Sequence, residues 1–199
     1  MLFLGPVYRF VQASWFGSVN HWPLLRLVFY SLDKSLLYLL VFAALRIGYL
    51  LLKRQRPHVG HEARVFAFVF YLLLLLALTV FRDVYYPWQL VLHWHRSLSV
   101  INFTPFVETL KLRQGVSQFD FWYQSLGNVM WFLPFGWGMA ALWGKKHFLA
   151  VTFAGIGLSV MIETLQFLLI SGVADIDDVI FNVTGVVVGY ISYRITQHR

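Results

Sequence analysis

Glu163–Gly189 reads ETLQFLLISGVADIDDVIFNVTGVVVG, in which acids and amides lie within and between two apolar runs. In water this pattern would be ordinary. Within a bilayer, buried acids and amides are costly, and they mark functional sites by default. The first question is therefore whether the chain is a membrane protein.

The composition answers this question. The 199 residues are 59% hydrophobic and only 13% charged, whereas a soluble domain carries about 25% charged residues. The chain has no cysteine, which excludes disulfides, a thiol nucleophile and cysteine metal sites. The net charge is +7, and the basic residues lie mostly beside apolar runs, where they set topology and meet anionic lipid. We therefore expect no nucleic-acid partner, and we predict no cofactor and no metal.

The apolar runs predict an all-α, polytopic membrane protein with a bundle of about five transmembrane helices. The predicted spans are residues 35–52, 63–81, 124–143, 148–170 and 179–193. Residues 82–125 predict an amphipathic, aromatic-rich loop on the membrane surface, helical over 88–96. Residues 1–60 would form an N-terminal interfacial segment and an extra span, and residues 63–193 the main transmembrane domain. Arg46 is expected to reach the headgroups.

Lysine and arginine predict the orientation. They gather after the first span, in the pair at 145–146 and in the C-terminal tail, whereas the turn at 171–178 has acids and no base. This bias places the N-terminus outside and the C-terminus inside the cell. The aromatic loop and the acidic turn would then face outward.

Helical spacing places Glu163 and Gln166 on one face of a span, and Asp178 and Asn182 on one face of the next. With Asn128 they would converge in the outer leaflet. Glu163 has no base nearby in sequence, so it needs a partner, a proton or water. We expect it to centre an outward-opening site and to donate a hydrogen bond to Asn182 or, through water, to Asp178.

Each polar residue also has a structural interpretation. Asn128, Gln166 and Asn182 could be interhelical hydrogen-bond partners. Asp175, Asp177 and Asp178 could form a solvated turn with one helix cap, which we favour for Asp177. Pro134 and Gly136 predict a bend near residues 130–134, and the Gly185-x-x-x-Gly189 spacing predicts close helix packing.

An ordered series of motifs resembles a known family. The series is Asn102-Phe-Thr-Pro105-Phe, Asn128 with Phe-Leu-Pro134-Phe-Gly136, Glu163-x-x-Gln166, and Gly172-x-x-Asp175-Ile-x-Asp178-Val-x-x-Asn182-x-x-Gly185. It resembles the VanZ family, named for a teicoplanin-resistance protein of Gram-positive bacteria. The resemblance implies a multi-pass protein of the cytoplasmic membrane of a Gram-positive bacterium. Its polar residues would be Asn102, Asn128, Glu163, Gln166, Asp175, Asp178 and Asn182.

Three functions fit these observations. The first is an outward-facing site that binds an amphiphile, such as membrane lipid, a lipid-linked wall precursor or a lipoglycopeptide, and so lowers susceptibility to teicoplanin. The second is an intramembrane enzyme that uses Glu163, Asp175 and Asp178 as acid and base or as ligands of a hard cation. The third is a small proton-linked transporter with Glu163 as its proton site.

Overall fold

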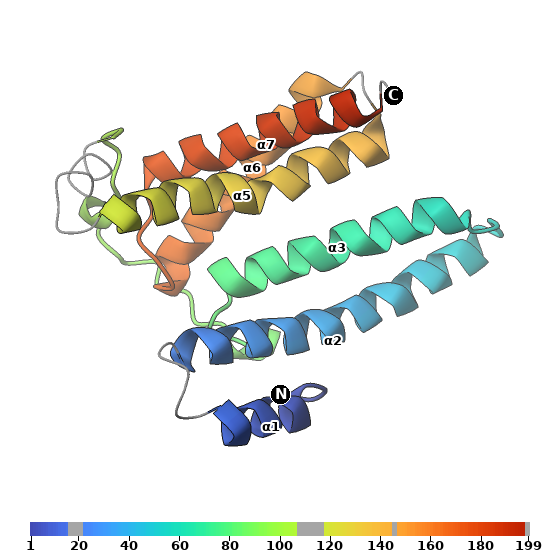
Figure 1. Cartoon of the computed structure of the whole chain (residues 1–199), viewed down its shortest axis with the longest axis horizontal. Helices are drawn as coiled ribbons and strands as arrows, with labels where there is room; N and C mark the ends of the chain where they lie inside the picture. The colour runs from blue at the N-terminus through green and yellow to red at the C-terminus, as the bar shows by residue number, and fades with distance from the viewer. Residues whose placement is uncertain (16–21, 107–117, 145–146, 198–199) are drawn as a thin grey trace. The chain divides into compact units, whose positions relative to one another are not determined.

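The computed structural model describes residues 1–15, 22–106, 118–144 and 147–197. The chain divides into two compact units, a first unit Met1–Leu90 and a second unit Val91–Arg199. The described residues form α-helices and short 3₁₀ helices, with no β-strand among them. Figure 1 shows the helices of each unit.

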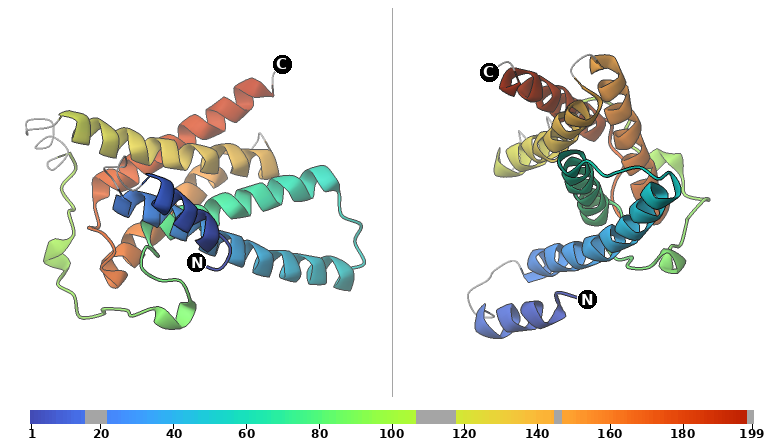
Figure 2. Two further views of the ribbon diagram at one scale, coloured as in Figure 1. Left: turned by 60° about the horizontal axis from the view of Figure 1, so that its bottom comes forward. Right: turned by 90° about the vertical axis from the view of Figure 1, so that its right-hand side faces the viewer.

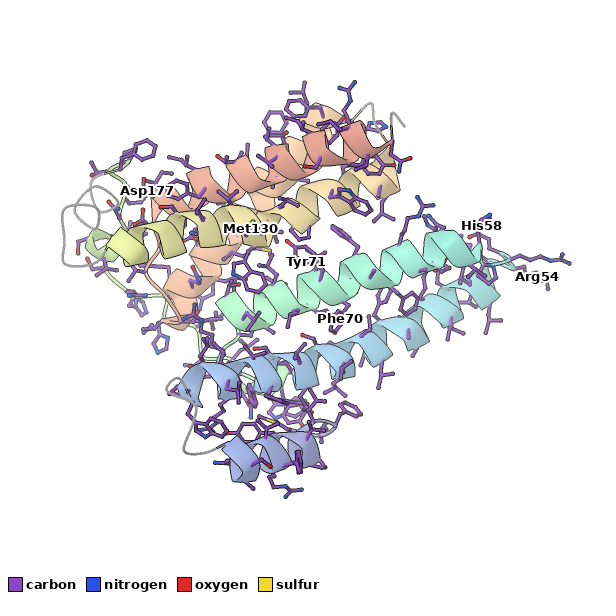
Figure 3. The ribbon with its side chains drawn as sticks, viewed as in Figure 1. Arg54, His58, Phe70, Tyr71, Met130 and Asp177 are labelled. Atoms are coloured by element: carbon purple, nitrogen blue, oxygen red, sulfur yellow. The ribbon has the colours of Figure 1, made fainter. Side chains whose placement is uncertain are left out.

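The first unit is built on two long antiparallel helices. The short helix α1 (Gly5–Trp15) precedes α2 (Trp22–Leu52) and α3 (Val59–Thr79), and a 3₁₀ turn η1 (Pro87–Gln89) follows. Arg54 and His58 lie in the tight connection between α2 and α3 (Figure 3). The helix α2 begins at Trp22, well before the predicted span at residues 35–52, and Asp33 and Lys34 are buried within it.

Asp33 joins three parts of the first unit. Its carboxylate accepts the backbone N–H groups of Leu2, Phe3 and Leu4 at 2.6–2.7 Å. It also accepts the phenol of Tyr85 at 2.5 Å. Burial raises the pKa of Tyr85, and the bond to Asp33 adds to the rise, so the phenol keeps its proton and donates.

The substitution Asp33→Asn should loosen the N-terminal residues. An amide has one acceptor oxygen for the four donors that Asp33 now binds. Hydrogen exchange at the amides of residues 2–4 should accelerate at least about tenfold, the effect of losing one hydrogen bond to a charged group. The exposed Asp83, replaced in the same way, is the control. Unchanged protection in Asp33→Asn would contradict the assignment.

Arg46 and Glu62 form a bidentate ion pair between α2 and α3. Arg46 Nε donates to Glu62 Oε2 at 2.9 Å, and its Nη2 donates to Oε1 at 2.7 Å. The prediction that Arg46 reaches the headgroups stays a prediction; the structure adds a partner for it, the carboxylate of Glu62 on the neighbouring helix. The pair ties the two helices together near the 53–58 connection.

The second unit contains three long helices and a preceding segment. A 3₁₀ turn η2 (Leu98–Val100) is followed by α5 (Gln118–Trp143), α6 (Phe148–Leu169) and α7 (Ile176–Thr196). Figures 1 and 2 show α5 running beside α7, with α6 against the same pair. α5 continues through Pro134 as one helix, so the bend predicted there stays a prediction.

The predicted helix over 88–96 is wrong. The backbone forms 3₁₀ turns at Pro87–Gln89 and Leu98–Val100 instead. His93 N–H donates to the carbonyl of Leu168 at 2.9 Å, so this segment pairs with the end of α6 rather than with itself. α5 begins at Gln118, earlier than the predicted span.

Four described helices are long and apolar enough to cross a membrane, namely α2, α3, α6 and α7. The predicted fold class, an all-helical multi-pass membrane protein, is confirmed. The remaining predicted span, residues 124–143, falls within α5, which has 26 residues but is not among these four. At about 1.5 Å per residue, α5 is still long enough to cross a hydrocarbon core of about 30 Å.

Glycines set the contact between α5 and α7. A Cβ on Gly189 would overlap the backbone oxygen of Leu133, and one on Gly185 would overlap that of Val129. From the other side, a Cβ on Gly136 would overlap the oxygen of Val186. The two backbones therefore touch directly, the close approach that small residues permit between membrane helices.

Candidate functional site

The segment Asn102–Phe106 is bound to the start of α7. Asn102 N–H donates to Ala174 O, and Ile176 N–H donates to Asn102 O, each at 3.0 Å. The Asn102 amide donates to Asp175 Oδ2 at 3.0 Å, and its oxygen accepts the N–H of Thr104. We call Asn102–Phe106 and Ala174–Asp178 together the loop junction.

The acids at the start of α7 hold this junction. Asp175 caps the helix, because its Oδ1 accepts the N–H of Asp177 at 2.8 Å. Asp177 Oδ1 in turn accepts the N–H of Phe106 at 2.7 Å. Asp177 is only 2% exposed, so its interpretation as a solvated turn residue was wrong. The buried carboxylate joins the two segments of the loop junction through its bond to Phe106. Figure 3 shows Asp177 at the beginning of α7.

Glu163 bonds to the junction from α6. It is 8% exposed, and its Oε2 accepts the N–H of Asp175 at 3.0 Å. The charges of Asp175 and Asp178 lie near it. The observed partner is a backbone donor, whereas the sequence suggested the side chains of Asn182 or Asp178. The acid is thus placed between the end of α6 and the cap of α7.

The other polar residues tie helices to one another. Asn128 on α5 donates to Asp178 Oδ1 on α7 at 2.5 Å. Asn182 on α7 donates to Ser159 on α6 at 2.9 Å. Within the described ranges the remaining oxygen of Asn182 is buried without a hydrogen-bond partner. Gln166 is buried and packs against Gly172: a Cβ added to Gly172 would lie 3.2 Å from the side-chain amide carbon of Gln166.

A groove lies beside Glu163. Its volume is about 470 Å³, and its walls come from α6, from the segment 94–103 and from the start of α7. The polar groups at the groove are Asn102, Glu163, Thr164 and Asp175, and the rest of the lining is apolar or aromatic: Trp94, Leu98, Ile101, Phe103, Val160, Phe167, Leu168, Ala174, Ile176 and Val179. An apolar groove with a few grouped polar atoms is the usual character of a small-molecule site.

Arg96 closes the end of α6. Its Nη1 donates to Phe167 O at 2.8 Å, and its guanidinium lies 5.0 Å from the centre of the Phe167 ring. A cation at the C-terminal carbonyls is favoured by the helix dipole. Sequence reasoning assigned Arg96 no specific role, and the one signal for it is its position shortly before the Asn102 motif.

A family model described as VanZ/LLP1 matches residues 68–197. The chain belongs to the VanZ/LLP1 family. Neither a curated protein nor a solved structure matches it. The VanZ/LLP1 match covers every polar residue of the predicted set, from Asn102 to Asn182, and the whole groove. It leaves out α1 and α2.

The polar VanZ/LLP1 residues form several hydrogen-bonded groups, and the prediction that they make up one site stays a prediction. Asn102, Glu163 and Asp175 meet at the groove, whereas Asn128 meets Asp178 and Asn182 meets Ser159. Pro105 lies in the junction turn before Phe106, whose φ is +63°. No three His, Cys, Asp or Glu side chains in the described part of the chain are grouped to hold a metal ion. The basic pair 145–146 lies outside the described residues.

Proposed function

We propose that the second unit of this VanZ/LLP1 protein binds one amphiphile of the cell envelope in the groove beside Glu163. The observation that carries the proposal is an apolar groove of about 470 Å³ with two carboxylates, Glu163 and Asp175, along it. The acyl chain lies against Val160 and Phe167 of α6, and the polar head lies at Glu163.

The acids favour a particular kind of head. Carboxylate oxygens accept hydrogen bonds, and Asn102 already uses its oxygen and one of its two amide N–H donors within the junction. A head with hydroxyl or amine donors is therefore favoured over a bare phosphate, which the acids would repel. The acylated amino sugar of a teicoplanin-type lipoglycopeptide and the sugars of a lipid-linked wall precursor both offer such donors.

Photo-crosslinking tests the groove directly. A benzophenone amino acid at Thr164, which lines the groove, should capture one class of amphiphile from cells, identified by the mass of the adduct. The same probe at Thr184 is the matched control, because it is an exposed threonine on α7 that does not line the groove. An identical mixture of bulk lipids at the two positions would contradict the proposal.

A protective role predicts a change in antibiotic susceptibility. Deleting the gene should increase teicoplanin susceptibility and the amount of labelled teicoplanin on the cell surface, and restoring it should reverse both changes. Vancomycin, which has no acyl chain, serves as the comparison compound. If neither measurement changes, the protein binds an amphiphile for another purpose, and the resistance version of the proposal fails.

The proposal places the groove on the outer side of the cytoplasmic membrane. Because the chain has no cysteine, single cysteines give a clean test. A cysteine at Val173, which is exposed in the turn between α6 and α7, should react with an impermeant thiol reagent in intact cells. A cysteine at Arg54 should react only after permeabilisation, since lysine and arginine favour the cytoplasmic side. The reverse pattern would invert the orientation.

A further inference from the structure

The first unit contains a cavity of its own, lined by other residues than the groove beside Glu163. It has a volume of about 230 Å³ and lies between α2, α3 and the segment 81–90. Leu73, Leu76, Ala77, Phe81 and Leu90 give it apolar walls. Pockets for drug-sized ligands occupy about 300–1,000 Å³, so this cavity fits a small ligand or part of a chain.

Lys34 supplies a positive charge to this cavity. It lines the cavity and is only 2% exposed. Its ammonium donates to the carbonyls of Phe81 and Val84. An ammonium has three donors, so one remains. In the described part of the chain Lys34 forms no ion pair, and Asp83 acts on its charge only from a distance.

Asp33, the neighbouring acid, is engaged elsewhere. Its carboxylate binds the N–H groups of residues 2–4 and the Tyr85 phenol, and it does not line the cavity. A buried ammonium is costly unless a counter-charge accompanies it. The carbonyls of Phe81 and Val84 provide hydrogen bonds for Lys34 but no negative charge.

Ser35 gives independent evidence for a missing acceptor. It also lines the cavity and is 1% exposed, and its hydroxyl has no hydrogen-bond partner among the described residues. Buried polar atoms in folded proteins are almost always hydrogen-bonded. Lys34 and Ser35 therefore border the same apolar cavity. Among the described residues, one ammonium donor and the Ser35 hydroxyl have no oxygen or nitrogen acceptor, and the ammonium lies 5.0 Å from the centre of the Tyr30 ring.

We propose that this cavity binds the carboxylate end of an acyl chain. The carboxylate accepts from Lys34 Nζ and Ser35 Oγ, and the first part of the chain packs against Leu73, Leu76 and Phe81. The carboxylate balances the charge of Lys34, which an ester or an alcohol would leave uncompensated. Among the described residues that line the cavity there is no other Lys or Arg, so a doubly charged phosphate is disfavoured.

The depth of Lys34 fits this ligand. At about 1.5 Å per residue, Lys34 lies about 27 Å along α2 from Leu52, which adjoins the basic connection. That distance is close to the thickness of the hydrocarbon core, about 30 Å. Lys34 therefore lies near the opposite boundary of the core, where the carboxylate of an inserted fatty acid also lies.

The test compares laurate with dodecanol, which has the same chain length and no charge. The full-length protein, delipidated and held in detergent, should bind laurate at least about tenfold more tightly than dodecanol in calorimetric titration, the effect of a hydrogen bond to a charged group. Equal affinities, or no laurate binding, would overturn the proposal. This comparison needs no variant.

Variants then locate the ligand. Lys34→Met should weaken laurate binding at least about tenfold and leave dodecanol binding unchanged. Ser35→Ala should weaken laurate binding several-fold. Lys53→Met, at an exposed lysine of the α2–α3 connection, is the control and should bind laurate like the wild type. Undiminished laurate binding in Lys34→Met would contradict the site. If Lys34→Met does not fold, the site is tested by the weaker laurate binding expected of Ser35→Ala and by the preference of the wild type for laurate over dodecanol.

Discussion

Replacing Gly189 with leucine should prevent α5 and α7 from packing. A Cβ at this position already overlaps the backbone oxygen of Leu133, and a backbone atom cannot move aside as a side chain can. Overpacking of a filled core usually costs about 1–3 kcal/mol, and a clash with backbone should reach or exceed the upper end. Thermal unfolding of the purified protein in detergent, followed by circular dichroism, should show a large fall in Tm.

Gly157→Leu is the matched control for this substitution. Gly157 lies on α6, is exposed, and a Cβ there would meet nothing within 4 Å. The control should unfold at nearly the wild-type temperature. Equal Tm values for the wild type and Gly189→Leu would show that α5 and α7 are not held in backbone contact.

Glu163→Gln should separate binding from folding. Glutamine keeps an oxygen that can accept the N–H of Asp175, so the start of α7 should remain intact. It loses the carboxylate that the proposed ligand head contacts. Bound amphiphile, measured by mass spectrometry of the purified protein, should fall at least about tenfold, since hydrogen bonds to charged groups contribute about 1.5–3 kcal/mol.

Glu163→Leu should lose stability as well as binding. It leaves the part-buried N–H of Asp175 without its present acceptor, which costs up to about 1–3 kcal/mol, the loss at a fully buried donor. Glu62→Gln, at the glutamate that pairs with Arg46 in the first unit, is the control and should keep the bound amphiphile. Full binding by Glu163→Leu at equal abundance would show that Glu163 is only a structural residue.

The apolar runs and the glycine spacing predicted most of the fold. Hydropathy alone indicated a multi-pass helical protein, and the Gly185-x-x-x-Gly189 spacing marked the face where α7 meets α5. The start of α2 was misplaced because Asp33 and Lys34 resemble a helix boundary in sequence. Both side chains bind backbone groups far away in sequence, at residues 2–4 for Asp33 and at residues 81 and 84 for Lys34. Backbone groups are the same in every residue type, so no sequence pattern marks these partners.

The same difficulty explains the errors at the site. Side-chain spacing placed Glu163 and Asn182 on facing helices, but Glu163 binds a backbone N–H and Asn182 binds Ser159. Asp177 looked like a surface residue because two other acids adjoin it. It is buried in the loop junction, where Phe106, 71 residues earlier in the chain, donates its N–H to it. A bond to backbone can form with any residue type, so the sequence gives no signal for it.

The groove beside Glu163 is tested most directly by filling it. Val160 lines the groove on α6 and is 48% exposed, whereas Val188 on α7 is 40% exposed and lies outside the groove. The amphiphile that co-purifies with each protein would be quantified by native mass spectrometry for the wild type, Val160→Trp and Val188→Trp. We predict that Val160→Trp loses most of it, while Val188→Trp retains the wild-type amount. Equal retention by both variants would contradict binding in the groove.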